Sequence, residues 1–265
     1  MTNRRFGLLT IVLISAALLV ACVTRDVPGP RAVVTDEFYD LLRWHGTAFH
    51  NNCWQAEILS DPDSARSTIW YDPASDTAGW HWSWPREAVA LLKGYPCLIV
   101  GEQPFLLAEP TTDRRFPLPL PETDTLWVRG DMAASGTGVF ELAFDLFFLD
   151  TRVPVPADIS CEIMIWLVST HECPATRFGE YEIDGHIYDF YVNTTWNDAP
   201  YLAFVLQDSS PPRRFPLHEF IRIGIEQGYV SPRSYLAGIL LGPEIWWGEG
   251  EATVHNLRFS LNGSR

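Results

Sequence analysis

One acidic side chain, Glu162, stands in an otherwise almost wholly apolar run, SCEIMIWLV, at residues 160–168. A buried, unpaired carboxylate destabilises a fold strongly, so an acid at such a position indicates a use. Side chains alternate between the two faces of a strand, which puts Glu162 on one face with Met164 and Trp166. The other face holds Cys161, Ile163, Ile165 and Leu167, which is typical of a sheet-to-sheet core.

A second run, VFELAFDLFF at residues 139–148, has the same arrangement. Its even-numbered residues form an apolar face, and the opposite face carries Glu141 and Asp145. For Glu141 we expect an ordinary solvated outer face. That interpretation suits Glu162 less well, because a solvated face usually carries Lys, Thr or Ser rather than a thioether and an indole.

A third run, GILLGPEIWWGEG at residues 238–250, places Glu244 directly after an apolar strand. Trp246, Trp247 and a glycine-rich turn follow it. Glu249 and Glu251 are nearby alternatives for the acid that this segment contributes.

Tryptophans provide a second signal, since the chain contains 11 of them. Trp80, Trp82 and Trp84 fall on one face of a strand, and Asn52 shares a face with Trp54. Pyranose rings stack on flat indoles while amides bind hydroxyl groups, so these residues together with the acids favour a polysaccharide site. The alternative for the tryptophans is core packing.

The elements that must position these residues are mostly short strands. We expect them at 48–58, 66–71, 79–84, 125–130, 138–148, 161–168, 187–193, 200–207, 235–240 and 252–261, each bounded by Pro, Gly, Asp or Asn. Residues 216–229 have helical spacing and predict one helix, while 104–124 is proline-rich and predicts a loop or edge. The pattern predicts an all-β sandwich of two sheets with one helix packed outside.

Length and charge bound the function. The 265 residues suit one large domain, and the formal net charge of −14 argues against nucleic acid or anionic lipid surfaces as partners. A neutral or basic polymer remains permitted. We expect no cofactor, and we expect a monomer.

The first residues predict export. A basic start precedes an apolar stretch, Phe6 to Val20, that is shorter than the ~20 residues a bilayer-spanning helix needs. It ends in Leu-Val-Ala-Cys22, which resembles the lipobox of bacterial lipoproteins; a plain signal peptide is the alternative. We therefore expect a signal peptide at 1–21, lipidated Cys22 and a tether at 22–36, and a catalytic domain at 37–265, anchored to a bacterial membrane outside the cytoplasm.

Four further cysteines, Cys53, Cys97, Cys161 and Cys173, could form disulfides in an exported chain. Of the three possible connectivities we favour Cys161 with Cys173, which closes a short loop, and Cys53 with Cys97. His171-Glu172-Cys173 looks like part of a metal site, but no second cluster at ligand spacing accompanies it, so we predict no metal.

The chain resembles glycoside hydrolase family 12, which comprises endo-β-1,4-glucanases and xyloglucanases on a concanavalin-like jelly roll of two antiparallel sheets. The resemblance rests on NNCW, on WHWSW followed by Lys93-Gly-Tyr95-Pro96, and on AFDLFF, CEIMIWL and GPEIWWGEG, which occur in the family's order. It spans about residue 40 to the C-terminus. Departures are Pro243 for a threonine, Cys161 for a tyrosine, and the bulky Trp246-Trp247 pair; they bear on substrate preference rather than on the reaction.

The resemblance implies a role for each site residue. Glu162 matches the nucleophile, Glu244 the acid/base, and Asp145 the aspartate that hydrogen-bonds the nucleophile. Asn52, Trp54, Met164 and Trp166 match positions that line the cleft, and we add Trp82 and Trp246 as substrate contacts. The implied activity is retaining hydrolysis of β-1,4 bonds in a β-glucan without a cofactor. The main alternative is a non-catalytic carbohydrate-binding lipoprotein on the same sandwich, and a weaker one is a structural lipoprotein with core tryptophans.

Overall fold

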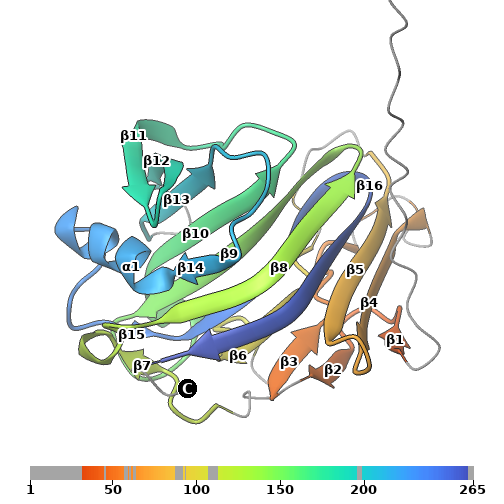
Figure 1. Cartoon of the computed structure of the whole chain (residues 1–265), viewed down its shortest axis with the longest axis horizontal. Coiled ribbons are helices and arrows are strands. Elements are labelled where there is room, and N and C mark those ends of the chain that lie inside the picture. The colour runs from red at the N-terminus through yellow and green to blue at the C-terminus, as the bar shows by residue number, and fades with distance from the viewer. Residues whose placement is uncertain are drawn as a thin grey trace, which may run out of the picture.

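The protein is a curved sandwich of two β-sheets with one helix beside it, in a computed structural model (Figure 1). The structure describes residues 32–261, except 45, 57–58, 60, 62–63, 87–91, 93, 107–112 and 196–198. The predicted signal peptide, Cys22 and most of the tether lie outside the described residues. Within the described part of the chain, no helix is both long and apolar enough to cross a membrane.

The first sheet, which we call sheet A, contains six strands in the spatial order β1-β4-β5-β16-β8-β14. Their bounds are β1 Val33–Thr35, β4 Arg66–Asp72, β5 Thr77–Trp84, β8 Trp127–Gly136, β14 Arg214–Pro216 and β16 Gly238–Ser260. All of its pairs are antiparallel.

The second sheet, sheet B, has the order β2-β3-β6-β16-β9-β10-β13-β12-β11. Its strands are β2 Leu41–Trp44, β3 Thr47–His50, β6 Cys97–Gly101, β9 Val139–Leu149, β10 Ile159–Ser169, β11 Thr176–Ile183, β12 His186–Asn193 and β13 Tyr201–Leu206. Short strand β15 (Tyr235–Leu236) pairs with the last two residues of β9, and β7 (Leu118–Pro119) pairs with β15.

Strand β16 belongs to both sheets. Residues 238–247 pair with β6 and β9 in sheet B, and residues 248–260 pair with β5 and β8 in sheet A. Gly248 makes the change of sheet possible: its φ is +112° and an added Cβ would lie 2.0 Å from the Thr137 carbonyl oxygen. Consequently Glu244 and Glu249, five residues apart, lie in different sheets.

The main core fills the space between the sheets, with Phe49, Phe144 and Ile163 from sheet B packed against residues such as Trp80 and Val254 from sheet A. Helix α1 (Leu217–Glu226) closes the sandwich over β10, β12 and β13, where its Phe220 contacts Tyr188 and Phe204. The prediction of an all-β jelly roll with one outside helix is confirmed. One pair, β10 with β13, is parallel. Since β11, β12 and β13 alternate in direction, β11 runs in the same direction as β10, which means that residues 170–175 turn the chain back before β11 begins.

Several element boundaries differ from those predicted. The strand expected at 48–58 ends at His50, and turns follow it. Strands β1, β2, β6, β11 and β14 were not predicted, since they are short, polar on both faces, or, like β6 (Cys97–Gly101), apolar on both faces without alternation. The segment expected as a loop at 104–124 includes β7 and a 3₁₀ turn at Leu120–Glu122.

The predicted disulfides are wrong: Cys53, Cys97, Cys161 and Cys173 are all free thiols. Cys161 faces the core between the sheets, whereas Cys173 packs with Met164, Trp166 and Tyr201 on the opposite face of sheet B, so the sheet lies between the two thiols. Cys53 and Cys97 approach each other, but they belong to the clusters on opposite faces of sheet B. Burial raises the pKa of Cys53 to about 12 and keeps that thiol protonated.

Candidate active site

Glu162 lies on the face of sheet B that is turned away from the core, which we call the site face. Its neighbours Cys161, Ile163, Ile165 and Leu167 all belong to the core, as the alternation predicted. Met164 and Trp166 share the site face with Glu162 and pack there with Ala143, Tyr201 and Ala203. Glu162 itself is half-buried.

Strand β9 is the centre of the site face, with β10 on one side and β16 on the other. Glu162 lies opposite Phe147 of β9, and Glu244 of β16 lies opposite Glu141 of β9. Asp145 lies between these two levels, opposite Met164. Three adjacent strands therefore deliver four carboxyl groups to one face of the sheet.

These carboxyl groups interact. Burial first, and then the charge of Glu244, raise the pKa of Glu162 to about 8. Burial and the charges of Glu162 and Glu244 raise the pKa of Asp145 far above its ordinary value. Like charges in a site of low polarity resist joint ionisation, so the group retains protons at neutral pH.

Asp145 differs in detail from its prediction. It is only 3% exposed, and its Oδ1 has no hydrogen-bond partner among the described residues. The expected hydrogen bond to Glu162 is not formed, and the two carboxyl groups interact through charge instead.

Glu141 was predicted to lie on a solvated outer face, and this prediction is wrong. Its side chain is 1% exposed, its Oε2 lies 2.6 Å from Nε2 of His171, and its carboxyl group shares a hydrogen bond with that of Glu244. Burial raises the pKa of Glu141 to about 7. The alternation of β9 gave the correct face, but nothing in the sequence indicated that β16 and the end of β10 cover it.

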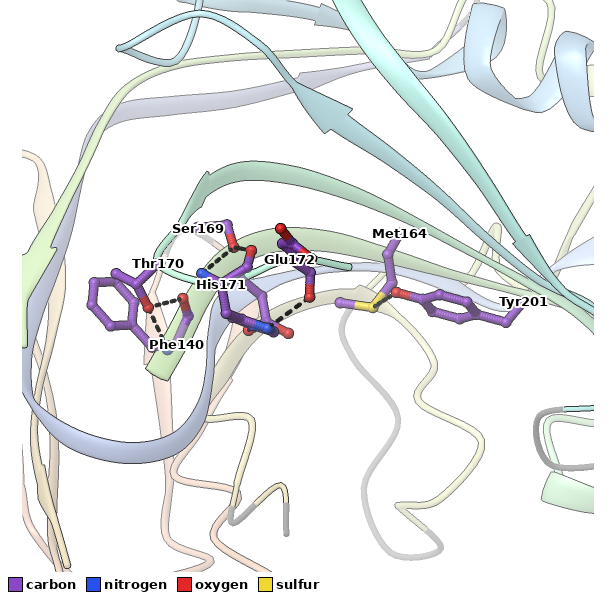
Figure 2. Close-up of polar contacts among 8 residues, drawn as sticks. Phe140, Met164, Ser169, Thr170, His171, Glu172 and Tyr201 are labelled. Carbon is purple, nitrogen blue, oxygen red and sulfur yellow. Dashed lines mark hydrogen bonds and ion pairs between the residues drawn. The ribbon is translucent and has the colours of Figure 1, made fainter. Parts of the chain in front are cut away.

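Two tyrosines of the site face were also missed as site residues. The Tyr95 hydroxyl donates a 3.0 Å hydrogen bond to the Ala143 carbonyl oxygen and thereby fixes β9. The Tyr201 hydroxyl donates to Sδ of Met164 at 3.4 Å (Figure 2), and Tyr201 lies beside Glu162 in the parallel pair of β10 and β13. Tyr95 belongs to the Gly-Tyr-Pro motif, which could have indicated it, whereas Tyr201 carries no sequence signal. Lys93 of the same motif lies outside the described residues.

Five of the six predicted substrate contacts fall into three groups. Trp54 follows β3 in a turn and is 38% exposed, and Asn52 is half-buried beside it. Trp246 is half-buried on the site face and contacts the His171 ring. Met164 and Trp166 are on the site face as predicted, but at 2% exposure each they form its floor.

Trp82 is a correction. It belongs to the core together with Trp80 and Trp84, and it packs edge-on against Phe140 with ring centroids 4.9 Å apart. All three side chains are at most 4% exposed, so the tryptophan face of β5 is a core face and offers no stacking surface.

Glu249 and Glu251 are likewise remote from the site face. They lie in the sheet A part of β16, on its outer face, where Ser83 Oγ donates to Glu249 at 3.4 Å and His81 approaches Glu251 at 3.7 Å. With Arg66 they line a polar hollow of about 480 Å³. Among the described residues, no three His, Cys, Asp or Glu side chains are arranged to hold a metal ion.

The sequence model for glycosyl hydrolase family 12 matches residues 47–262. No curated protein sequence matches the chain.

Similar solved structures include a family 12 xyloglucanase from Bacillus licheniformis (TM-score 0.73, 21% identity, 87% of this chain and 100% of the other). They also include an endoglucanase from Rhodothermus marinus (TM-score 0.71, 19% identity, 87% and 99%) and endoglucanase 3 from Trichoderma harzianum (TM-score 0.71, 18% identity, 89% and 100%). At this identity the structural likeness shows a shared fold.

Proposed function

Because the chain belongs to glycosyl hydrolase family 12 and is a glycoside hydrolase, we propose that it cleaves β-1,4-glucosidic bonds within β-glucan chains with retention of anomeric configuration. The substrate would be cellulose, mixed-linkage glucan or xyloglucan. The observation that carries this proposal is the interaction between Glu162 and Glu244, two carboxyl groups on the strands that flank β9.

Retaining glycosidases use one carboxylate as nucleophile and one carboxylic acid as proton donor. In the proposed reaction Glu162 attacks the anomeric carbon while Glu244 gives its proton to the departing glycosidic oxygen. Glu244 then takes a proton from water, which displaces Glu162 from the sugar.

The environments of the two acids support this division of roles. The carboxyl group of Glu244 has a hydrogen-bond partner in Glu141 that favours its protonated form and raises its pKa, whereas Glu162 has no such partner among the described residues. When the pair holds a single proton, that proton therefore belongs on Glu244, and Glu162 is the carboxylate.

Asp145 would act on Glu162. Its pKa is raised well above the ordinary value by burial and by neighbouring acids, so it is protonated at neutral pH and able to donate a hydrogen bond to Glu162 during the reaction. Trp54 and Trp246, which keep exposed ring surface, are the proposed stacking partners for sugar rings, with Asn52 as a hydroxyl partner.

We also propose that the enzyme is exported and held at a bacterial membrane by lipid on Cys22, and that it acts as a monomer. The lipobox-like Leu-Val-Ala-Cys22 after an apolar stretch supports the anchor.

The proposed activity is tested with a panel of soluble polysaccharides, wild-type enzyme and Glu162→Gln, with products identified and the anomeric form of the first product followed by NMR. We expect oligosaccharides that first appear in the β-configuration, and no products from the variant. Initial products of α-configuration would contradict retention. Binding without release of reducing ends would favour the non-catalytic carbohydrate-binding alternative.

A further inference from the structure

The two-carboxylate reaction has no task for Glu141, yet this acid occupies the position on β9 directly opposite Glu244. It is 1% exposed. A buried carboxyl group without a partner would destabilise the fold by several kcal/mol, so its contacts are informative.

The first contact is with His171. Nε2 of His171 lies 2.6 Å from Oε2 of Glu141, and Nδ1 lies 3.1 Å from the carbonyl oxygen of Glu172. A carbonyl oxygen can only accept, so Nδ1 carries a hydrogen. The contact between Nε2 and Oε2 therefore contains one proton: either the carboxylic acid donates to neutral imidazole, or imidazolium donates to carboxylate.

The structure holds His171 in place for this contact. Ser169, which lies opposite Glu141 in register, donates to the His171 carbonyl oxygen at 2.7 Å and accepts from its N–H at 3.2 Å. Thr170 binds the Phe140 backbone of β9 from both sides, with its hydroxyl at 3.0 Å from the N–H and 3.1 Å from the carbonyl oxygen. Figure 2 shows this turn at the end of β10 with His171 turned toward Glu172.

Tryptophan rings flank His171. Its ring centroid lies 5.1 Å from that of Trp166 and 5.9 Å from that of Trp246, and the side chain is 17% exposed. The imidazole is thus kept from most solvent, and exchange of its proton with Glu141 is favoured over exchange with water.

The second contact of Glu141 is with Glu244. Their carboxyl groups share a hydrogen bond, which requires a proton on one of them. Glu244, Glu141 and His171 therefore form a hydrogen-bonded chain, in which the protonation state of each group depends on that of the group beside it.

We propose that Glu141 and His171 act as a positioning pair that adjusts to the protonation state of Glu244 during the cycle; the inference rests on the proposed function of Glu244 as acid/base. While Glu244 holds its proton, Glu141 is a carboxylate that accepts from both Glu244 and imidazolium. When Glu244 gives its proton to the leaving group, the proton of the His171–Glu141 contact moves from Nε2 to Oε2. Glu141 and His171 are then both neutral, so the newly formed carboxylate of Glu244 lies beside a carboxylic acid rather than beside another carboxylate.

The two groups are suited to such a transfer. Burial raises the pKa of Glu141 to about 7 and lowers the pKa of His171 from 6.5, so burial favours the neutral arrangement with the proton on Oε2. The hydrogen bond that Glu141 accepts from protonated Glu244 lowers the pKa of Glu141 and so favours the ion pair, and this influence ends when Glu244 loses its proton.

Other ionisable groups surround Glu244 and bear on the experiment. They are Glu141 and Asp145 of β9, Glu162 of β10, His171 after β10, Tyr95 before β6, Cys97 of β6, Cys173, and Tyr201 of β13. Among the residues that the structure describes, only Glu141 and His171 are placed to change the charge beside Glu244 near neutral pH without belonging to the proposed reaction itself.

The experiment measures kcat/KM on soluble β-glucan as a function of pH for wild type, Glu141→Gln, His171→Gln and the double variant. Removing Glu141 removes the repulsion that favours protonated Glu244. The pH at which kcat/KM falls on the basic side of the profile should therefore decrease by about one pH unit. Removing His171 leaves a carboxylate beside Glu244, so this pH should increase by a similar amount. The double variant should resemble Glu141→Gln, because His171 acts through Glu141.

His186→Gln is the matched control, since His186 makes a 2.5 Å contact with Asp208 at the far edge of sheet B and should leave the profile unchanged. Melting temperatures identify variants that fail to fold. The proposal would be overturned if the basic side of the pH profile stays in place in both folded single variants, or if it moves in the same direction in both.

A second measurement does not need activity. The imidazole resonance of His171 in wild type should show two inflections with pH, the higher one reporting ionisation of Glu244. That inflection should be absent in Glu244→Gln and in Glu141→Gln. A wild-type titration with one inflection, unchanged in Glu244→Gln, would overturn the positioning pair even if no β-glucan is hydrolysed, whereas two inflections without hydrolysis would count against the proposed function alone.

Discussion

At the scale of single residues, the most unusual property of this chain is the gathering of four acids on one face of a sheet. Glu141, Asp145 and Glu244 are held in surroundings that raise their pKa, and the pKa of Glu162 reaches about 8. Such clustering works against stability, because each group would be more stable ionised in water. Sites that shift several acids together are typical of catalysis, where each proton position is used.

Glu162→Gln should reduce kcat on β-glucan by roughly 10⁴-fold or more, because the amide cannot attack the anomeric carbon. Binding of oligosaccharides should remain, since the change is nearly isosteric. Turnover and isothermal titration calorimetry measure the two effects. Glu251→Gln, on the outer face of sheet A, is the matched control, and wild-type turnover in Glu162→Gln would refute the nucleophile assignment.

Glu244→Ala should lower kcat on β-glucan by about 10²–10⁴-fold, the usual contribution of a general acid. The loss should be much smaller on aryl glycosides with activated leaving groups, and azide should restore turnover by occupying the vacated space as a nucleophile. Rates with and without azide measure this. Because Glu249 and Glu251 lie in sheet A, a variant without rescue would direct attention to Glu141 as the acid.

At the scale of elements, the site depends on how β16 and β9 are shared. β9 contributes its Phe face to the core and its acid face to the site, while β16 serves sheet B up to Trp247 and sheet A from Gly248. The elements also give two kinds of tryptophan position: those in turns, such as Trp54 after β3, and those on core faces of strands, such as Trp82 of β5.

These positions predict opposite phenotypes. Trp54→Ala should raise KM several-fold with little change in melting temperature, because the ring is 38% exposed. Trp82→Ala should lower the free energy of unfolding by about 3–5 kcal/mol and the melting temperature by roughly 10 °C, because it leaves a core cavity. Steady-state kinetics and thermal melts measure both. If Trp82→Ala instead keeps the wild-type stability and has a raised KM, then Trp82 is a substrate contact after all.

The alternation of residues predicted much of this fold and site. β5, β9, β10 and α1 were located from period-2 or helical patterns, and the faces of Glu162 and Asp145 followed from them. Alternation shows that the two faces of a strand differ, but it does not show which other elements pack on each face. Glu141 was therefore taken as solvated and Trp82 as exposed, since both depend on partners far along the chain.

The cysteine pairing failed for a related reason. Cys161 and Cys173 are near in sequence, but Cys161 faces the core whereas Cys173 packs with Met164 and Trp166 on the other face of sheet B, so the sheet separates them. The contact between His171 and Glu141 was likewise invisible, because it joins residues 30 positions apart through the register of β9 and β10.

At the scale of the whole molecule, the chain combines a glucan-hydrolysing fold with a proposed lipid anchor at residue 22. Cys22→Ala should release the protein from the membrane fraction and abolish incorporation of labelled palmitate, because no other residue of the lipobox offers a thiol. Fractionation and labelling measure this, and Cys173→Ala is the control. Label that persists in Cys22→Ala would contradict the anchor.

The acid cluster also makes stability depend on pH. Burial raises the pKa of Glu141 from 4.5 to about 7 and that of Glu162 from 4.5 to about 8, so the folded state binds these protons more tightly than the unfolded state. Their stabilisation is fully present below pH 4.5 and is lost as the pH rises through 7 to 8. For Glu141 this amounts to a loss on the order of 3 kcal/mol, partly offset by His171, whose lowered pKa acts in the opposite sense.

We therefore expect the free energy of unfolding, measured with denaturant at a series of pH values, to fall between pH 5 and pH 8. Glu141→Gln and Glu162→Gln should each flatten the decline, because a neutral amide releases no proton, and their combination should flatten it most. Glu251→Gln, outside the cluster, should keep the wild-type slope. A wild-type stability that stays level or rises over this range would mean that the four acids ionise freely in the folded protein, and that the site face holds no proton for Glu244 to donate.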